Sequence, residues 1–496
     1  MNSRRQAALV FVALALLAAA FRFPHLADRP MHADEAVNAD KLGTLLETGK
    51  YEYSTVDYHG PSLYYVSLVA ARAQGIRRYV DLNEVTLRAV PAMLGVLLVA
   101  AHFFLIPYVG LPAAASAGLF TAVSPAMVYY SRYYIHETLF VLLSFCALLA
   151  FFAYFRNRTP GRAILVGALF GLLFATKETV IVVTACMLVA WLWARRSLPQ
   201  PSLDAPQILL AVAAAVVVAL LMMSSFFTHP RGIVDSILAY GTYFHRGAGL
   251  DTAHVHPWYF YFQCLLYSRF TEIFLAVLAV IGIIVAGPGV PRFLAVYTVL
   301  MAIVYSAIPY KAPWNILGFL HGMILLAGIA AAWMLQHARK TAVFALLLLG
   351  STQLAWQAHA ASFSYAADPR NPWVYAHTGP DVFAITEQIA MLAKTNPALP
   401  IQIFTRENLW PLPWYLRRYS GVRWWNGVSD TAPSAPVILA TPDMEPALLH
   451  KLYDMPPPGQ REMYVNMFDR YIELRPRVEV RGYIAKSLWD DVQEQR

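Results

Sequence analysis

The residues best suited to chemistry form small polar groups beside long apolar stretches, and the first group is an adjacent pair of carboxylates. Asp34 and Glu35 open the segment MHADEAVNAD, which predicts an amphipathic helix that ends at Gly49. Acidic residues in a first helical turn stabilise the helix dipole by about 0.3–1 kcal/mol. A carboxylate held beside a membrane-level cavity would instead be desolvated, with a raised pKa suited to a general base. From the residues alone both interpretations stay open.

A second group comprises Arg132, His136 and Glu137, in the segment VYYSRYYIHETLFVLL. His136 and Glu137 enter an apolar stretch, where polar side chains are costly and usually face a cavity or a partner. The neighbouring tyrosines fit an aromatic belt at a membrane interface, but a belt does not account for a buried glutamate. We therefore expect this group to be functional.

Three further segments carry cations or imidazoles. Lys311, in IPYKAPWNIL, could anchor a helix or hold an anionic lipid phosphate. His59, in DYHGP, precedes a Gly-Pro break that would fix it at a loop-to-helix turn, where it could donate to a phosphate or satisfy a carbonyl. Lys177 and Glu178 are adjacent, and a local ion pair is the simpler interpretation.

Evidence for a metal site is weak. His254 and His256 alternate along an extended segment, but two ligands without a carboxylate companion do not define a site. A divalent cation at Asp34 and Glu137 is left open, although no D-x-D motif supports it. The sequence thus predicts no metal ligand.

The elements that must position these groups are membrane-spanning helices. Of the 496 residues, 58% are hydrophobic and 14% charged, whereas soluble domains have about 25% charged residues. The apolar blocks are roughly 16 to 22 residues long, enough to cross a hydrocarbon core about 30 Å thick. The block at 61–74 is short and interrupted by arginine, so it predicts a helix lying in the interface. Eleven spans are predicted, at 6–22, 88–107, 111–130, 136–155, 162–179, 180–194, 207–228, 270–287, 292–309, 313–335 and 341–360.

Charge orients these spans. The formal charge of +8 comes largely from arginines at the ends of apolar blocks, and no Lys/Arg stripe interleaved with aromatics suggests nucleic-acid binding. With the N-terminus in the cytoplasm, alternation places every clear basic hairpin on the cytoplasmic side. The polar groups then lie on the extracytoplasmic face of the cytoplasmic (inner) membrane. The basic residues in question are Arg4, Arg5, Arg156, Arg158, Arg162, Arg195, Arg196, Arg292, Arg339 and Lys340.

The domain boundary is expected near residue 362. Residues 1–362 are expected to form the transmembrane domain, with a long first external loop, and 363–496 a small extracytoplasmic α/β domain of short strands and helices. The strand-like runs are 401–404, 422–425, 436–441 and 478–485. Four tryptophans of this region could stack on sugar rings, although packing is the simpler explanation; they are Trp410, Trp414, Trp424 and Trp425.

In combination these motifs resemble the GT-C glycosyltransferases over most of the chain, among them the protein O-mannosyltransferases and the lipid A aminoarabinose transferases. MHADEAVNAD, DYHGP, SRYYIHET, TKET, PYKAPWN, NPWVYAHT and PLPWYLR look most like one bacterial and archaeal subgroup. Its members are labelled flippase-activity-associated proteins of glycosylation, or dolichyl-phosphate-mannose-protein mannosyltransferase-like.

The resemblance implies a polyprenyl-phosphate sugar donor, a protein, glycan or lipid acceptor, and transfer on the external face. It assigns the base to Asp34 with Glu35 in support, and it fits a second acidic position to Glu137. His59-Gly60-Pro61 stands where the aminoarabinose transferases have Lys-Pro, which leaves the phosphate clamp of this chain open.

The sequence therefore predicts a GT-C-like membrane hexosyltransferase. We expect the donor phosphate to be held by His59, Arg132, His136 and Lys311. The alternative is a flippase, or a flippase-associated protein for lipid-linked glycans, which would perform no bond chemistry. A secondary transporter is disfavoured, since the chain shows no internal repeat and no paired broken helices at mid-membrane depth.

Overall fold

The computed structural model describes residues 3–55, 59–198, 204–250, 254–394, 396 and 398–494. Asp57 and Tyr58 of the DYHGP motif lie outside the described residues. The chain divides into two compact units. The first comprises Met1–Leu26 and Lys41–Tyr375, and the second comprises Ala27–Asp40 and Ala376–Arg496.

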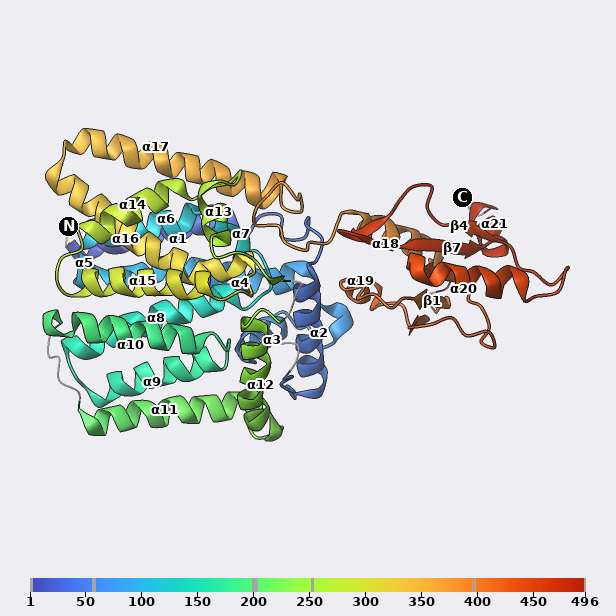
Figure 1. Ribbon diagram of the computed structural model, residues 1–496, viewed down its shortest axis with the longest axis horizontal. Helices are drawn as coiled ribbons and strands as arrows, with labels where there is room; N and C mark the ends of the chain where they lie inside the picture. The colour runs from blue at the N-terminus through green and yellow to red at the C-terminus, as the bar shows by residue number, and fades with distance from the viewer. Residues whose placement is uncertain are drawn as a thin grey trace. The chain divides into compact units, whose positions relative to one another are not determined.

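The first unit is a bundle of long apolar helices that run side by side (Figure 1). Each of the eleven predicted spans contains a helix, so the multi-pass helical prediction is confirmed. Within the described residues eight helical stretches are long and apolar enough to cross a membrane, while α6, α9 and α14 are apolar but shorter. The principal helices are α1 (Ser3–Arg22), α4 (Glu84–Ala101), α6 (Leu111–Val123), α7 (Pro125–Tyr130), α8 (Glu137–Arg156), α9 (Pro160–Phe174), α10 (Val180–Ala194), α11 (Ala205–Met223), α14 (Ile273–Ile284), α15 (Val290–Ala307), α16 (Leu317–His337) and α17 (Lys340–His359).

Small residues let these helices approach closely. A Cβ added at Gly167 of α9 would lie 1.9 Å from the carbonyl oxygen of Ala211 in α11, and one added at Gly328 of α16 would lie 2.4 Å from that of Ala113 in α6. Helices in a bilayer gain little from excluding water from each other, so close backbone contact of this kind is a main source of their association.

The two ends of the bundle differ. The long helices alternate in direction, so the turns that carry Arg158, Arg195 and Arg339 lie at the end where α1 begins (Figure 1). The other end carries short helices, including α3 (Ser62–Ala73) and α12 (Arg231–Gly247), and α12 runs across the direction of α11 (Figure 1). Val234, Ile237 and Leu238 of α12 are exposed. The predicted helix at 61–74 is present as α3.

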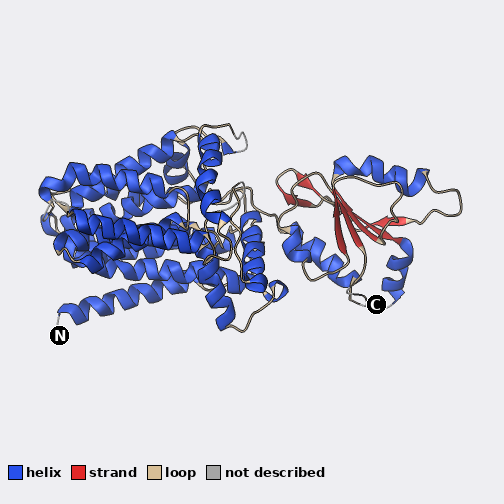
Figure 2. Cartoon of the chain, turned by 90° about the horizontal axis from the view of Figure 1, so that it is seen from below, coloured by secondary structure: helices blue, strands red, loops and turns tan. Residues whose placement is uncertain are grey.

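The second unit holds a five-stranded sheet between helices (Figure 2). The strand order is β2-β1-β3-β7-β4, in which β1 pairs in parallel with β2 and β3, and β7 is antiparallel to β3 and β4. The predicted small α/β domain is therefore confirmed. The strands are β1 (Ile401–Phe404), β2 (Val422–Trp425), β3 (Val437–Ala440), β4 (Tyr464–Asn466) and β7 (Arg481–Ala485), with a separate hairpin of β5 (Glu473–Arg475) and β6 (Val478–Glu479).

Both faces of this sheet are buried. The face that carries Ile403 and Leu439 packs against α18 (Asp381–Leu392) and α19 (Leu412–Leu416), and the face that carries Ile438 packs against α20 (Glu445–Leu449). Trp414 is fully buried, whereas Trp424 and Trp425 lie about two-fifths exposed on the edge strand β2. The four tryptophans thus do not share one exposed face.

Candidate functional site

A buried ion pair joins the start of α8 to the turn between α9 and α10. Lys177 Nζ lies 2.5 Å from Glu137 Oε1 and donates a second hydrogen bond of 3.0 Å to Asn315 Oδ1. Both charged side chains are less than one-tenth exposed. Burial would lower the pKa of the Lys177 ammonium, but the Glu137 carboxylate outweighs it and the pKa is raised. Two of the three ammonium donors are used within the described residues.

A second buried carboxylate holds an imidazole. Glu178 Oε2 lies 2.7 Å from His59 Nδ1, and its Oε1 accepts a hydrogen bond of 2.6 Å from the Tyr53 hydroxyl. The Tyr243 hydroxyl lies 3.2 Å from the same nitrogen of His59. Burial would raise the pKa of Glu178, but His59 and the hydrogen bond from Tyr53 lower it below its ordinary value. Nδ1 of His59 is thereby engaged on the carboxylate side, which directs Nε2 away from Glu178.

The adjacent pair Lys177–Glu178 is therefore not a local ion pair, and that interpretation is wrong. Each member instead reaches a partner far away in the sequence, Lys177 to Glu137 and Glu178 to His59. Successive residues of a tight turn point in different directions, so one short segment ties two separate elements together.

The Gly-Pro segment after His59 packs its backbone directly against the turn at Ala175 and Thr176. The backbone N–H groups of Gly60 and Ser62 donate to the carbonyls of Thr176 and Ala175, at 3.2 and 3.1 Å. A Cβ at Gly60 would lie 2.2 Å from the Ala175 oxygen, so only glycine permits this approach. The prediction that the break holds His59 at a loop-to-helix turn is confirmed, since α3 begins at Ser62.

His136 contacts the turn that carries His59 and Gly60. Its Nε2 lies 3.0 Å from the carbonyl oxygen of Gly60, and its ring meets that of His59 edge-on at 5.3 Å. The side chain is almost completely buried. His136 therefore contacts the loop that carries His59 through both its Nε2 and its ring.

Arg132 binds backbone carbonyls at the end of α1. Its guanidinium donates to the carbonyls of Arg22, Pro24 and His25, at 2.9, 2.7 and 3.1 Å, just beyond the end of α1. The sequence predicts this cation as a phosphate ligand. Its hydrogen bonds to carbonyl groups at the end of α1 are those of a helix cap.

Lys311 is held close to the backbone of His254 and His256. Its Nζ donates to the carbonyls of Ile308 and His256, at 2.5 and 3.1 Å, and burial lowers the pKa of the ammonium. His254 and His256 both lie within hydrogen-bond distance of the Tyr375 hydroxyl, at 2.7 and 3.1 Å. No group of three or more His, Cys, Asp or Glu side chains in the described part of the chain is placed to hold a metal ion.

The first-loop carboxylates belong to the second unit, and they differ from each other. α2 (Ala33–Thr48) begins with both, and Glu35 is fully buried, accepting from Arg29 at 3.0 Å and from the backbone N–H of His32 at 2.9 Å. This reach back to the start of the helix is that of a capping box. Asp34 is about half exposed. Its charge partly offsets the fall in the pKa of Arg475 caused by burial.

The same segment is fixed to the C-terminal part of its unit. The backbone N–H of Met31 donates to the Tyr415 hydroxyl at 2.8 Å, and the rings of His32 and His377 stack at 5.6 Å. Neither contact is foreseeable from local sequence patterns, because the partners are more than 340 residues apart.

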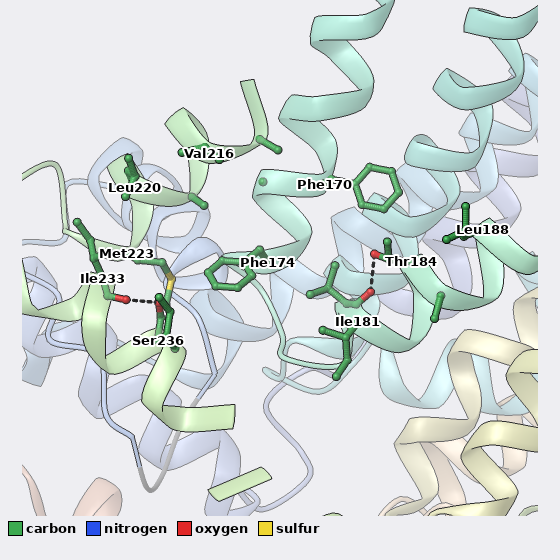
Figure 3. A pocket seen from close by; sticks show the side chains of 16 residues that line it. Phe170, Phe174, Ile181, Thr184, Leu188, Val216, Leu220, Met223, Ile233 and Ser236 are labelled. Atoms are coloured by element: carbon green, nitrogen blue, oxygen red, sulfur yellow. Dashed lines mark hydrogen bonds between the residues drawn. The ribbon is translucent and has the colours of Figure 1, made fainter. Parts of the chain in front are cut away.

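An apolar groove of about 620 Å³ runs between α9, α10, α11 and α12 (Figure 3). Its two labelled hydroxyls, Thr184 and Ser236, donate to carbonyls of their own helices at 2.8 and 2.7 Å, so they offer no donor to an occupant. Val180, which lines the groove, follows Glu178 by two residues, and Phe174 stacks on Tyr240 at 6.2 Å. We call Lys177, Glu178 and their partners Glu137 and His59 the polar cluster. The groove therefore begins two residues along the chain from this cluster.

Comparison with known proteins gives a family match and several similar folds. Residues 73–223 match the family model of dolichyl-phosphate-mannose-protein mannosyltransferase, and no curated protein matches the sequence. The structure of ArnT from Cupriavidus metallidurans bound to undecaprenyl phosphate is similar with a TM-score of 0.64, over 96% of this chain and 97% of that chain, at 14% identity. The chain has the GT-C glycosyltransferase fold.

Two further solved structures share the GT-C fold. The oligosaccharyltransferase AglB from Archaeoglobus fulgidus, in complex with an inhibitory peptide and a dolichol-phosphate, gives a TM-score of 0.56 at 12% identity, over 89% of this chain and 70% of that one. The arabinofuranosyltransferase AftD from Mycobacteria gives 0.50 at 17% identity, over 98% of this chain and 40% of that one.

Proposed function

We propose that the protein is a membrane glycosyltransferase that moves a sugar, most simply a hexose, from a polyprenyl-phosphate donor to an acceptor. The observation that carries this proposal is the pairing of Lys177 with Glu137 and of His59 with Glu178 at one end of a GT-C bundle, beside an apolar groove. Two solved structures of this fold are bound to a polyprenyl phosphate, which supports the choice of donor.

The two parts of the donor, its lipid tail and its phosphate, match the apolar groove and the polar cluster respectively. The apolar groove has no polar group to offer, so it suits the hydrocarbon tail of the lipid. For the phosphate we retain His59 and Lys311 and add Lys177, because N–H donors aimed at a phosphate in a partly dry site stabilise its developing charge strongly. Arg132 and His136 are reassigned to positioning, since the Arg132 guanidinium is bonded to three carbonyls around the end of α1 and Nε2 of His136 is bonded to Gly60. Lys311 also donates to two carbonyls, and we propose its third ammonium hydrogen for the phosphate.

The chemistry proposed is a single displacement. Asp34, assigned by its motif, takes the proton of an acceptor hydroxyl with Glu35 ordering its helix turn. The hydroxyl oxygen forms a bond to the anomeric carbon while the bond from that carbon to the phosphate oxygen breaks and leaves its electron pair on the lipid phosphate. Glu137 holds Lys177 in place for that phosphate. Alignment of the reacting groups supplies much of the rate enhancement in such a reaction.

The orientation proposed follows the positive-inside rule. The basic turns share the end of the bundle where α1 begins, which would be cytoplasmic in an inner-membrane protein, and the polar cluster at the other end would be extracytoplasmic. We propose an extracytoplasmic position for 363–496 on the same ground. A membrane-impermeant maleimide applied to intact cells should label Lys50→Cys and spare Arg196→Cys; the reverse pattern would invert the topology.

The experiment that tests the function uses the purified full chain in nanodiscs, radiolabelled polyprenyl-phosphate hexoses and cell-envelope acceptors. Label should pass to the acceptor fraction, and Asp34→Asn should reduce the rate by at least about a hundredfold, the scale of a lost general base. Asp28→Asn, an exposed acid of the same segment, is the matched control. Near-normal transfer by Asp34→Asn would refute the base assignment, and lipid movement without transfer would favour the flippase alternative.

A further inference from the structure

A second pocket, of about 390 Å³, lies within the C-terminal unit, and none of the residues that line it is assigned above. It opens where β7 begins and β4 ends, and the loop between β4 and β5 forms one wall. Its size is in the range of small-ligand pockets. The residues that carry its chemistry are Glu445, Asn466, Tyr471, Glu479 and Arg481.

The floor of the pocket, by which we mean Glu445, Glu479, Arg481 and Tyr483, is a hydrogen-bonded network of charged and polar side chains. Arg481 donates to Glu445 through one terminal nitrogen and to Glu479 through Nε, the latter at 2.7 Å. The Tyr483 hydroxyl also donates to Glu445. Each carboxylate can accept about four hydrogen bonds, so both carboxylates retain acceptor capacity while Arg481 keeps them in place.

The wall of the pocket is aromatic. Tyr471 is 57% exposed, and Phe468 lies against the backbone of β7 at Gly482, where an added Cβ would come within 2.8 Å of its ring. Glycine at this position therefore lets the loop close onto the strand. Arg470, at the rim, pairs with Asp381 at 2.9 Å.

These groups select against most ligand classes. The two carboxylates that line the pocket balance its two guanidiniums, and Arg470 is already paired, so an anion would find no excess positive charge. A wholly apolar ligand would leave the floor unsatisfied. Hydroxyl groups both donate and accept, and they match a floor on which carboxylates and a guanidinium alternate. The C–H face of a sugar ring fits an exposed aromatic face.

We propose that this pocket binds an uncharged saccharide, with Tyr471 stacked on a ring and Glu445, Glu479 and Asn466 bonded to hydroxyl groups. The site would give the C-terminal unit a glycan-binding role that is separate from sugar transfer. It also differs from the tryptophan face considered from the sequence, because β2 and β4 lie at opposite edges of the sheet.

The test measures saccharide binding by the full chain in nanodiscs, using isothermal titration calorimetry and saturation-transfer NMR. The probes are mannotriose, maltotriose and chitotriose, with trigalacturonate as an anionic counterpart. At least one neutral trisaccharide should bind saturably, and trigalacturonate should bind at least about tenfold more weakly. Tyr471→Ala and Glu479→Gln should each weaken binding about tenfold, with unchanged unfolding temperature for Tyr471→Ala because that ring is exposed.

Trp424→Ala, on the far edge of the same sheet, is the matched control and should bind within about twofold of the parent chain. The proposal is overturned if no neutral trisaccharide binds at millimolar concentration, if trigalacturonate binds best, or if Trp424→Ala abolishes binding while Tyr471→Ala does not. Absence of saccharide binding would not affect the transfer of label to envelope acceptors. The binding proposal and the transferase proposal can therefore be refuted independently.

Discussion

Replacing Lys177 by Met should strongly destabilise the protein, and a second substitution at Glu137 should largely restore it. Both side chains are less than one-tenth exposed, so Lys177→Met leaves the Glu137 carboxylate buried without its cation. Breaking a buried pair in this way costs about 3–5 kcal/mol. Lys177→Met with Glu137→Leu removes both charges, and what remains is about 1 kcal/mol for the lost partner of Asn315, which is half-buried.

Unfolding temperature in detergent, followed by intrinsic fluorescence, separates these cases. In a chain of this length each kcal/mol shifts the midpoint by at most about 2 °C, so the single variant should fall by roughly 5 °C and the double variant by about 1 °C. Transfer activity should be lost in both, because the cation proposed for the phosphate is absent from both. The reasoning fails if Lys177→Met is as stable as the parent chain, or if the double variant is less stable than either single one.

Two further predictions concern the turn that carries His59. Gly60→Ala places a Cβ within 2.2 Å of the Ala175 oxygen, so it should displace His59 from Glu178 and lower turnover about tenfold. Gly161→Ala, whose Cβ enters open space, is the control and should leave turnover unchanged. Equal turnover of the two variants would refute the positioning role of Gly60. Glu178 has a lowered pKa in the fold, so its contribution to stability is present above the ordinary carboxyl pKa and is lost as the pH falls through the folded value. A pH series of unfolding temperatures should therefore decline less steeply below pH 5 for Glu178→Gln than for the parent chain, and parallel curves would contradict this.

Much of the fold follows from local pattern. A block of apolar residues has only one way to satisfy its backbone in a bilayer, so the spans could be read directly, and α2 ends where Gly49 takes a positive φ of 74°. The strands β1 and β2 coincide with the runs predicted at 401–404 and 422–425. These features depend on residues close together in the sequence.

The polar cluster was less predictable because its contacts are remote. Lys177 and Glu178 are adjacent, and nothing in TKET indicates that they bind partners 40 and 119 residues away. Tyr53 and Tyr243, which contact the same histidine and glutamate, lie in none of the motifs recognised in the sequence. One feature of the sequence did indicate partners. An unpaired charge between consecutive apolar spans is energetically costly, so Lys177 and Glu178 must each pair with another group. Sequence pattern offered helix capping for the acidic pair, but it could not show that Glu35 takes this role while Asp34 stays half exposed.

The most direct test is to measure polyprenyl phosphate released from a polyprenyl-phosphate hexose by the purified protein, together with label gained by the acceptor. A transferase produces the two in equal amounts, and both should fall together in His59→Gln. Lipid that crosses the bilayer with its sugar still attached, and no release of polyprenyl phosphate, would contradict the account.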